Sequence, residues 1–424
     1  MSKRPVSRRG FLQTSAAAAV KSAIVAPSVH AAGSDLLKIA LVGCGGRGTG
    51  AAINALGADK NFKLVAVADV FEDLAKSGLN VVKAAFPDKV DVKPENIFSG
   101  FDAYKAATDA ADVVVMAAPP GFRPMHFAYA VEKGKHVFME KPHAVDATGA
   151  RAVIASAQLA KTKGLSVVSG FCYRFDPFKR DLVQRIHDKA IGEVNTIHTT
   201  FMTGELWTRG TKTNDPKQME YQLRMWYYFT WLSGDFIVEQ AIHNVDKACW
   251  VMNGQMPKSA TGLGGRHLRT DPKFGNIWDN FSIVYDYESG AKVVLQCRQM
   301  KDCVGDNNDA ILGTNGRCDL MRHTIKPTNG ASYTPPGKHD FGAMYQNEHD
   351  ELFAAIRSGK PVNDAERSAN STLMTIMGRE AAYTGQRITW EKMLASKQDL
   401  MPKSFDWVEN PVPGVAMPGK TKFV

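Results

Sequence analysis

The chain has 424 residues, of which 44% are hydrophobic and 22% are charged, a composition typical of a globular protein long enough for two domains. Its net charge is +9, but five of these positive charges come from residues 1–31, which contain no acidic residue; the rest is too weakly basic for a nucleic-acid-binding protein. The six cysteines are scattered without a CxxC pair, which excludes a disulfide scaffold and a zinc ribbon.

The first 31 residues have the pattern of an export signal. Residues 7–13, SRRGFLQ, resemble the twin-arginine motif; a short apolar run follows at 16–25, and Val29-His30-Ala31 fits a cleavage site. We therefore predict that residues 1–31 are a signal peptide for the twin-arginine translocase and that the mature protein is periplasmic. A disordered basic tail is the alternative interpretation.

The next stretch predicts a strand, a glycine-rich turn and a helix. Residues 38–42 are apolar β-formers, residues 43–48 read GCGGRG, and residues 51–58 favour a helix. In the G-x-G-x-x-G pattern, Gly43 allows the tight turn, Gly45 lets backbone approach a pyrophosphate, and Gly48 lets helix and strand pack closely. Gly46 and Arg47 belong to the same loop and are candidate cofactor-binding residues.

A second predicted strand, residues 62–70, supports this interpretation because it contains Asp69 near its end. Asp69 lies 21 residues after Gly48, close to the spacing expected for a carboxylate that binds the ribose hydroxyls of a dinucleotide. A carboxylate there repels a 2′-phosphate, so NAD is expected rather than NADP. A glycine turn with an unrelated surface aspartate is the alternative.

Strands and helices then alternate, with further buried strands at 112–118 and 135–140. This alternation predicts an α/β domain with a doubly wound parallel sheet over residues 36–155. Ligands bind beyond the carboxyl ends of such strands, where Pro119, Glu140 and Lys141 follow two of them. A solvated lysine in a loop remains the alternative for Lys141.

Residues 156–400 predict a second α/β domain, and the tail 401–424 is irregular and proline-rich. Hairpins expected at 278–300 and 310–320 predict a large, mostly antiparallel open sheet. The outer face of such a sheet needs cover, which favours a homo-oligomer, either a dimer or a tetramer. The polar loop 204–220 is expected to form a lid or a subunit contact.

Several side chains of this domain are candidates for binding substrate. Tyr173 and Arg174 follow a predicted strand at 165–171, Trp226 and Tyr227 belong to an aromatic block, and Asp246 ends the stretch 233–246. Aromatic faces suit the apolar side of a sugar ring, although such blocks more often form core or interface.

Residues 233–246 predict a helix with chemistry on one face. Glu239 and His243 are four residues apart, and Asp246 follows three residues later, so the imidazole is expected between two carboxylates. Such neighbours hold a histidine pKa near neutral pH, as a general base requires. A surface salt bridge is the alternative, and the spacing differs from HExxH, so no metal is expected.

With these motifs together, the chain resembles the glucose–fructose oxidoreductase / inositol dehydrogenase / rhizopine-catabolism (Gfo/Idh/MocA) family. The resemblance rests on the glycine loop with Asp69, on residues 117–120 (AAPP), on Glu140-Lys141-Pro142, on Glu239 with His243, and on residues 381–390. It implies an N-terminal Rossmann domain and a nicotinamide-dependent oxidoreductase that acts on a hydroxyl of a sugar, glycoside or cyclitol. It also implies that Lys141 binds the reacting hydroxyl and that His243 takes its proton. Glu239 stands where the family usually has aspartate, so its role stays open.

Export and the resemblance together lead to further expectations. The twin-arginine pathway carries folded proteins and the periplasm supplies little free dinucleotide, so we expect NAD to be tightly bound. One alternative is a redox-neutral glycoside lyase or hydrolase that works through a transient keto-sugar with trapped NAD. Another is a non-catalytic carbohydrate-binding protein that keeps the dinucleotide for structure, although Lys141 and His243 argue against it.

Overall fold

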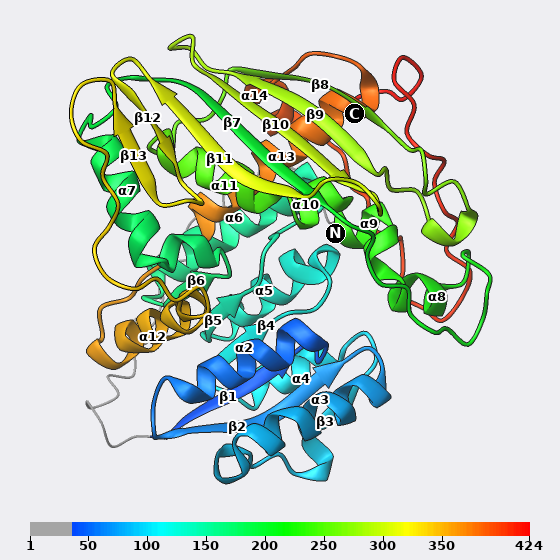
Figure 1. Ribbon diagram of the computed structural model, residues 1–424. Coiled ribbons are helices and arrows are strands. Elements are labelled where there is room, and N and C mark those ends of the chain that lie inside the picture. Colours follow the sequence, from blue (N-terminus) through cyan, green and yellow to red (C-terminus); the bar gives the residue numbers. More distant parts are fainter. Residues whose placement is uncertain (1–35) are drawn as a thin grey trace, which may run out of the picture.

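The computed structural model describes residues 36–424 and contains two β-sheets with helices packed between and around them (Figure 1). The N-terminal sheet has the order β3-β2-β1-β4-β5-β6, and all its neighbouring strands are parallel. Its strands are β1 (Leu37–Val42), β2 (Phe62–Asp69), β3 (Ile97–Ser99), β4 (Val113–Met116), β5 (His136–Met139) and β6 (Val167–Ser169). The helices between them are α2 (Gly46–Gly57), α3 (Glu72–Ala85), α4 (Ala103–Asp109), α5 (Arg123–Glu132) and α6 (Ala147–Thr162).

The predicted doubly wound parallel sheet is therefore confirmed. Its strands form because short runs of β-branched and aliphatic residues are buried on both faces, as in β4, where all four residues are buried. The sheet continues through β6, which pairs with β5. It thus extends to Ser169, past residue 155, where the sequence pattern placed the end of this domain.

The C-terminal sheet has eight strands in the order β13-β12-β11-β7-β10-β9-β8-β14. The strands are β7 (Val194–Thr203), β8 (Ser259–Gly265), β9 (Asn280–Asp286), β10 (Lys292–Gln299), β11 (Asp306–Gly313), β12 (Gly316–Asp319), β13 (Thr324–Pro327) and β14 (Ile388–Thr389). Its pairs are antiparallel except β7 with β10. The expected large, mostly antiparallel sheet is present.

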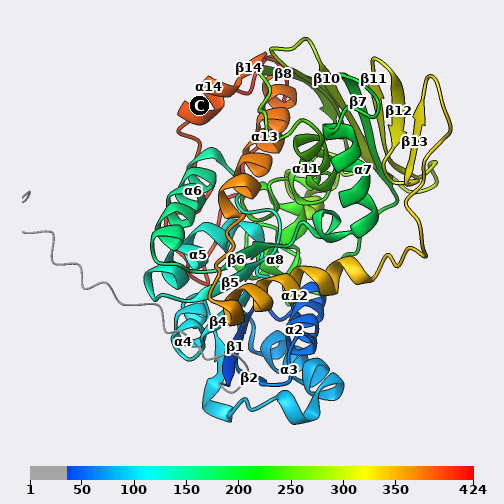
Figure 2. The same ribbon diagram turned by 90° about the vertical axis from the view of Figure 1, so that its left-hand side faces the viewer.

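Helices cover one face of this sheet (Figure 2). They include α7 (Pro177–His187), α11 (Ile242–Val251) and α13 (Ala365–Thr384). Along β10, buried residues alternate with less buried ones, because successive side chains of a strand point to opposite faces. The buried side packs on these helices, so the site-bearing segments are held between the two sheets.

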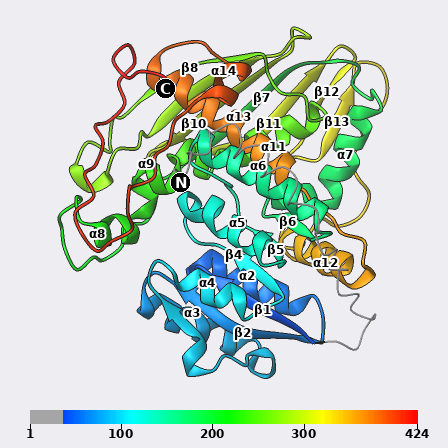
Figure 3. The same cartoon turned by 180° about the vertical axis from the view of Figure 1, so that it is seen from behind.

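The remaining elements pack around the two sheets. The helix α12 (Ala343–Ser358) packs against both α2 and β6. The short helices α8 (Met219–Arg224), α9 (Thr230–Ser233) and α10 (Phe236–Glu239) precede α11, and α14 (Trp390–Ala395) precedes the tail. The C-terminal tail then runs down beside α8 (Figure 3). Among the described residues, no helix combines the length and apolar composition needed to cross a membrane.

Candidate active site

A cleft between the two domains forms a cavity of about 380 Å³ at the carboxyl ends of β1, β2, β4 and β5. The first domain contributes the glycine loop, Asp69, Pro119 and Glu140-Lys141 to its walls, and the second domain contributes Glu239 and His243. This is the crevice in which ligands of open α/β sheets bind. The structure thus brings the predicted cofactor residues and the predicted catalytic residues into one cavity.

The glycine loop has the shape that a dinucleotide needs. Gly43 has φ +93°, and a Cβ there would lie 2.2 Å from the backbone nitrogen of Ala118, so no other residue fits. A Cβ on Gly48 would lie 1.9 Å from the carbonyl oxygen of Gly43. Gly45 and Gly46 face open space in the cleft at the start of α2. Backbone and helix N-terminus are therefore free to approach a pyrophosphate.

Asp69 ends β2 and faces the same cleft. Its Oδ2 accepts a hydrogen bond from the backbone N–H of Cys44 at 2.8 Å, and its Oδ1 accepts one from the N–H of Phe71 at 3.1 Å. Burial raises the pKa of this carboxyl, and the two N–H donors oppose that shift. Each oxygen retains a lone pair for a ribose hydroxyl, so the described residues fit NAD.

Arg47, predicted to bind the cofactor, lies in the wall of the cleft but is engaged by two carboxylates. It is ion-paired with Glu140 and, at 2.9 Å, with the buried Glu348 of α12. Burial lowers the pKa of Arg47, but the two carboxylates raise it more. The guanidinium therefore holds α12 against the end of β5, next to Lys141.

Lys141 directly follows Glu140 beyond β5 and reaches across the domain junction. Its Nζ lies 2.8 Å from Oε1 of Glu239 and also donates to the backbone carbonyl of Glu239. Both side chains are largely buried, with 14% and 12% of their areas exposed. The first domain's lysine is thus fixed by the second domain's glutamate.

The predicted helix over residues 233–246 is wrong in one respect. It is divided into α10, which ends at Glu239, and α11, which begins at Ile242. The carboxylate of Glu239 binds Lys141, and that of Asp246 binds Arg174, with Nε–Oδ2 and Nη2–Oδ1 distances of 2.7 and 2.9 Å. The imidazole of His243 is therefore not held between two carboxylates.

His243 instead lies in an aromatic and cationic environment. The rings of Tyr173 and Phe171 meet the imidazole edge-on, at centroid distances of 5.3 and 6.1 Å. Burial lowers the pKa of His243 well below its usual value, and the ammonium groups of Lys141 and Lys247 lower it further. The expectation of a pKa near neutral is thus wrong, and the imidazole is neutral. Its Nδ1 is buried without a hydrogen-bond partner among the described residues.

The structure places one of the predicted substrate-binding residues in the lining of the cleft and the other four outside it. Trp226 lines the cleft. Tyr227 is fully buried and donates to Oε1 of Gln299 at 3.0 Å, and Arg174 and Asp246 form the buried ion pair described above. Tyr173 lies behind His243. These last four side chains therefore shape the cavity from outside its lining.

Several lining residues were not predicted. They include Phe201, Arg209, Gln240 and Tyr345. Arg209 belongs to the loop that the sequence predicted to be a lid or a subunit contact, and Gln240 directly follows Glu239, so the segments around both residues had been singled out. Phe201 and Tyr345 come from β7 and α12, and no local pattern distinguishes them from ordinary core residues.

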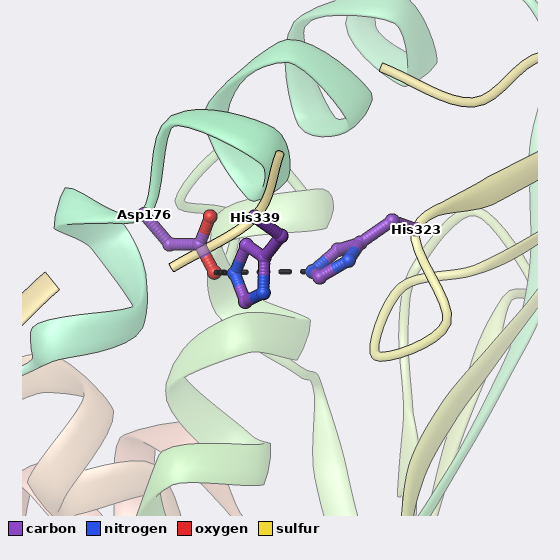
Figure 4. Close-up of side chains that lie close together, drawn as sticks. All are labelled: Asp176, His323 and His339. Atoms are coloured by element: carbon purple, nitrogen blue, oxygen red, sulfur yellow. Dashed lines mark hydrogen bonds and ion pairs between the residues drawn. The ribbon is translucent and has the colours of Figure 1, made fainter. Parts of the chain in front are cut away.

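A separate group of metal-ligand side chains lies outside the cleft, where Asp176, His323 and His339 point toward one another (Figure 4). Oδ2 of Asp176 is 2.7 Å from Nζ of Lys179 and 3.0 Å from Nε2 of His339. The same Lys179 ammonium is 2.9 Å from Nε2 of His323. The buried Lys179 ammonium thus already binds two of the three side chains that could hold a metal ion.

Comparison with known proteins identifies the family. Residues 37–171 match the model of an oxidoreductase family with an NAD-binding Rossmann fold, and residues 180–319 match the GFO/IDH/MocA C-terminal domain. The chain belongs to the Gfo/Idh/MocA family. It is accordingly an NAD-dependent oxidoreductase, in agreement with the cleft residues that fit this cofactor.

Curated and solved relatives support the same assignment. Inositol 2-dehydrogenase of Rhizobium meliloti (strain 1021) is 26% identical over 320 residues, which cover 73% of this chain and 85% of that protein. The structure of myo-inositol 2-dehydrogenase from Lactobacillus plantarum has a TM-score of 0.63 at 19% identity, covering 84% of this chain and 99% of that one. The scyllo-inositol dehydrogenase of Lactobacillus casei with bound NAD(H) and scyllo-inositol has a TM-score of 0.62 at 18% identity, covering 84% and 99%. At these identities the two structures establish the shared Gfo/Idh/MocA fold.

Proposed function

We propose that the protein oxidises a secondary hydroxyl of a cyclitol, sugar or glycoside, with NAD as the hydride acceptor. The observation that carries this proposal is the arrangement of Lys141 and His243, which come from different domains and line one cavity with the glycine loop. The inositol dehydrogenases among the relatives make cyclitols the first substrates to test.

Lys141 provides the positive charge in this mechanism. Its ammonium is held by Glu239 at 2.8 Å, and it donates to the oxygen of the reacting hydroxyl. The ammonium stabilises the negative charge that develops on that oxygen as the C–H bond is broken, and burial strengthens this interaction. Glu239 keeps the lysine in place and partly balances its charge.

His243 removes the hydroxyl proton. The lowered pKa leaves the imidazole neutral, so it can accept a proton without first losing one. The edge-on contacts with Tyr173 and Phe171 limit rotation of the ring. When it is bound, NAD is the hydride acceptor, and the protein residues position the hydroxyl and accept its proton.

The proposal includes export and the assembly of identical subunits into a homo-oligomer. The twin-arginine signal of residues 1–31 lies outside the described residues, and periplasmic location rests on that sequence pattern. A homo-oligomer formed through the C-terminal sheet is proposed because helices cover only one face of that sheet. Mass spectrometry of the exported protein tests the first, with a mature N-terminus near Ala32 as the expected result.

A redox-neutral reaction is the second candidate. In this alternative, Lys141 and His243 perform the same proton and charge chemistry in both directions, and the keto-sugar is reduced again before release. The enclosure of the cofactor cleft, described in the next subsection, favours it, because a dinucleotide that stays bound must be regenerated in place. Net formation of NADH separates this candidate from simple dehydrogenation.

The deciding experiment is a substrate panel on the purified exported protein. We expect a cyclitol or sugar to change the oxidation state of the bound nicotinamide. The variants Lys141→Ala and His243→Ala should lower turnover by roughly 10²- to 10⁴-fold while NAD stays bound. Lys161→Ala, on the exposed face of α6, is the control. Activity of the two cleft variants close to the wild-type level would remove these residues from the mechanism.

A further inference from the structure

The end of the cleft beyond Asp69 is covered by parts of the second domain. Phe71 and Phe101 of the first domain and Arg209 and Leu223 of the second line this end together. In a Rossmann domain, the carboxylate at the end of the second strand binds the ribose of the adenosine half. The second domain therefore encloses the adenosine end as well as the end at which chemistry occurs.

One connection at this end is an ion pair across the domain junction. Nη1 and Nη2 of Arg224 lie 2.9 and 3.0 Å from the two carboxylate oxygens of Asp73, which lies in the first turn of α3. The Arg224 guanidinium also lies 3.9 Å above the ring of Phe71. A two-point contact of this kind fixes orientation as well as distance, so it holds the last turn of α8 over the wall of the cleft.

The C-terminal tail adds an aromatic layer on the same wall. Phe405 lies 5.7 Å from Phe101 and 5.4 Å from Phe122, and Trp407 lies 5.0 Å from Phe101 and 5.7 Å from Phe71, measured between ring centroids. The three first-domain rings line the cleft. The tail thus packs directly behind the side chains that would surround the adenosine.

The tail is held in this position by the second domain (Figure 3). The N–H of Met219 donates to the carbonyl of Val408 at 3.2 Å. Asn410 and Gln222 exchange two hydrogen bonds of 2.6 and 3.0 Å. The segment therefore bridges α8 and the first domain, although it has no regular secondary structure.

Arg209 completes the enclosure from the loop between β7 and α8. It lines the cleft, and its guanidinium lies 4.1 Å above the ring of Trp207. It is near enough to Asp69 to oppose the rise that burial causes in the pKa of that carboxyl. A cation thus faces the ribose-binding carboxylate from the opposite domain.

From these contacts we infer that Arg209, Arg224 and tail residues 405–410 form a clasp that retains the dinucleotide at its adenosine end. Release of NAD requires the Arg224–Asp73 ion pair and the aromatic layer to separate, so the cofactor behaves as a prosthetic group. The inference adds residues to the cofactor site of the proposed function and does not depend on which substrate is oxidised.

Exchange of bound cofactor tests the clasp. The full-length protein is loaded with NAD labelled in the nicotinamide ring and mixed with an excess of unlabelled NAD, and retained label is measured after rapid desalting. The double variant Phe405→Ala/Trp407→Ala and the variant Arg224→Ala should release label about tenfold faster or more, since each aromatic pair contributes a modest but additive stabilisation. The single variant Trp407→Phe keeps an aromatic ring at this position, so it should retain much more label than the double alanine variant.

Val415→Ala is the matched control, because this residue belongs to the same tail but lies outside residues 405–410 and is 41% exposed; the variant should exchange label at the wild-type rate. Label loss from the wild-type protein within the mixing time, or equal rates in all variants, would overturn the clasp. Slow exchange in a protein that oxidises no cyclitol or sugar would contradict the proposed function alone, and rapid exchange in an active enzyme would contradict the clasp alone.

Discussion

Glu239 binds Lys141 and not His243, the residue four positions after it. The 2.8 Å contact joins the end of β5 in one domain to the end of α10 in the other. Glu239 therefore acts on the mechanism through the lysine, because it determines where the ammonium lies within the cleft. This relationship assigns Glu239 to orientation of the lysine, a role that the sequence had not suggested.

Replacements of Glu239 should differ according to whether they keep an oxygen near Lys141. Glu239→Gln retains a hydrogen-bond acceptor, so we expect kcat/KM to fall by about tenfold, mainly through the lost charge. Glu239→Ala leaves only the backbone carbonyl as a partner, and a fall of roughly 10²-fold or more is expected. Steady-state kinetics on the substrate found in the panel checks both. Equal activity of the Ala and Gln variants would contradict a positioning role.

The pKa of His243 should respond to Lys141. Burial is the larger cause of its lowered pKa, and the Lys141 ammonium is the next. Lys141→Met removes that charge at similar side-chain length, so the pKa of His243 should rise toward its usual value while remaining below it. Histidine ¹³C NMR titration measures this shift. The exposed Lys301→Met should leave the titration unchanged, and a fall of the pKa in Lys141→Met would refute the charge assignment.

The first domain could be predicted from sequence because its signals are local. Continuous apolar runs mark its strands, and Gly43, Gly48 and Asp69 occupy positions that only particular residue types allow. Some segments of the C-terminal sheet were harder to predict. The strand β8 contains three glycines in seven residues and only one β-branched residue, Thr261, so it lacks the composition that normally identifies a strand.

The start of α10 depends on partners far away in the chain. Asp235 has φ +73°, and its carboxylate accepts from the N–H of Trp278 at 2.8 Å and from the hydroxyl of Tyr383. These tertiary bonds fix where α10 starts, and a helical periodicity cannot reveal them. The contacts of Phe405 and Trp407 with the cofactor domain are equally non-local. The parts of the candidate site that the sequence did not predict are therefore those formed by long-range packing.

Asp69 should set the preference for NAD over NADP. Asp69→Asn keeps an oxygen for the backbone N–H of Cys44 or Phe71 but removes the charge. We expect NAD to bind about tenfold more weakly, since hydrogen bonds to a charged group are lost, and NADP to bind more tightly because repulsion of its 2′-phosphate is relieved. Calorimetry on protein freed of cofactor measures both affinities. An unchanged ratio of the two would show that another residue makes the selection.

His349 should make the protein sensitive to acid. It is fully buried in α12, stacks on Phe138 at a centroid distance of 4.0 Å, and has no hydrogen-bond partner for either ring nitrogen among the described residues. Burial lowers its pKa well below the usual value, and Arg47 lowers it further. The unfolded chain therefore binds a proton near pH 6.5 that the folded chain does not, so stability from this residue is lost as pH falls below about 6.5.

The variant His349→Phe keeps the stacking on Phe138 and removes the titrating group. At pH 5 we expect the wild type to have lost about 2 kcal/mol relative to this variant, a difference that vanishes above about pH 7. Urea unfolding at several pH values measures it, and a difference that does not change with pH would show that His349 is protonated in the folded protein or contributes only through packing.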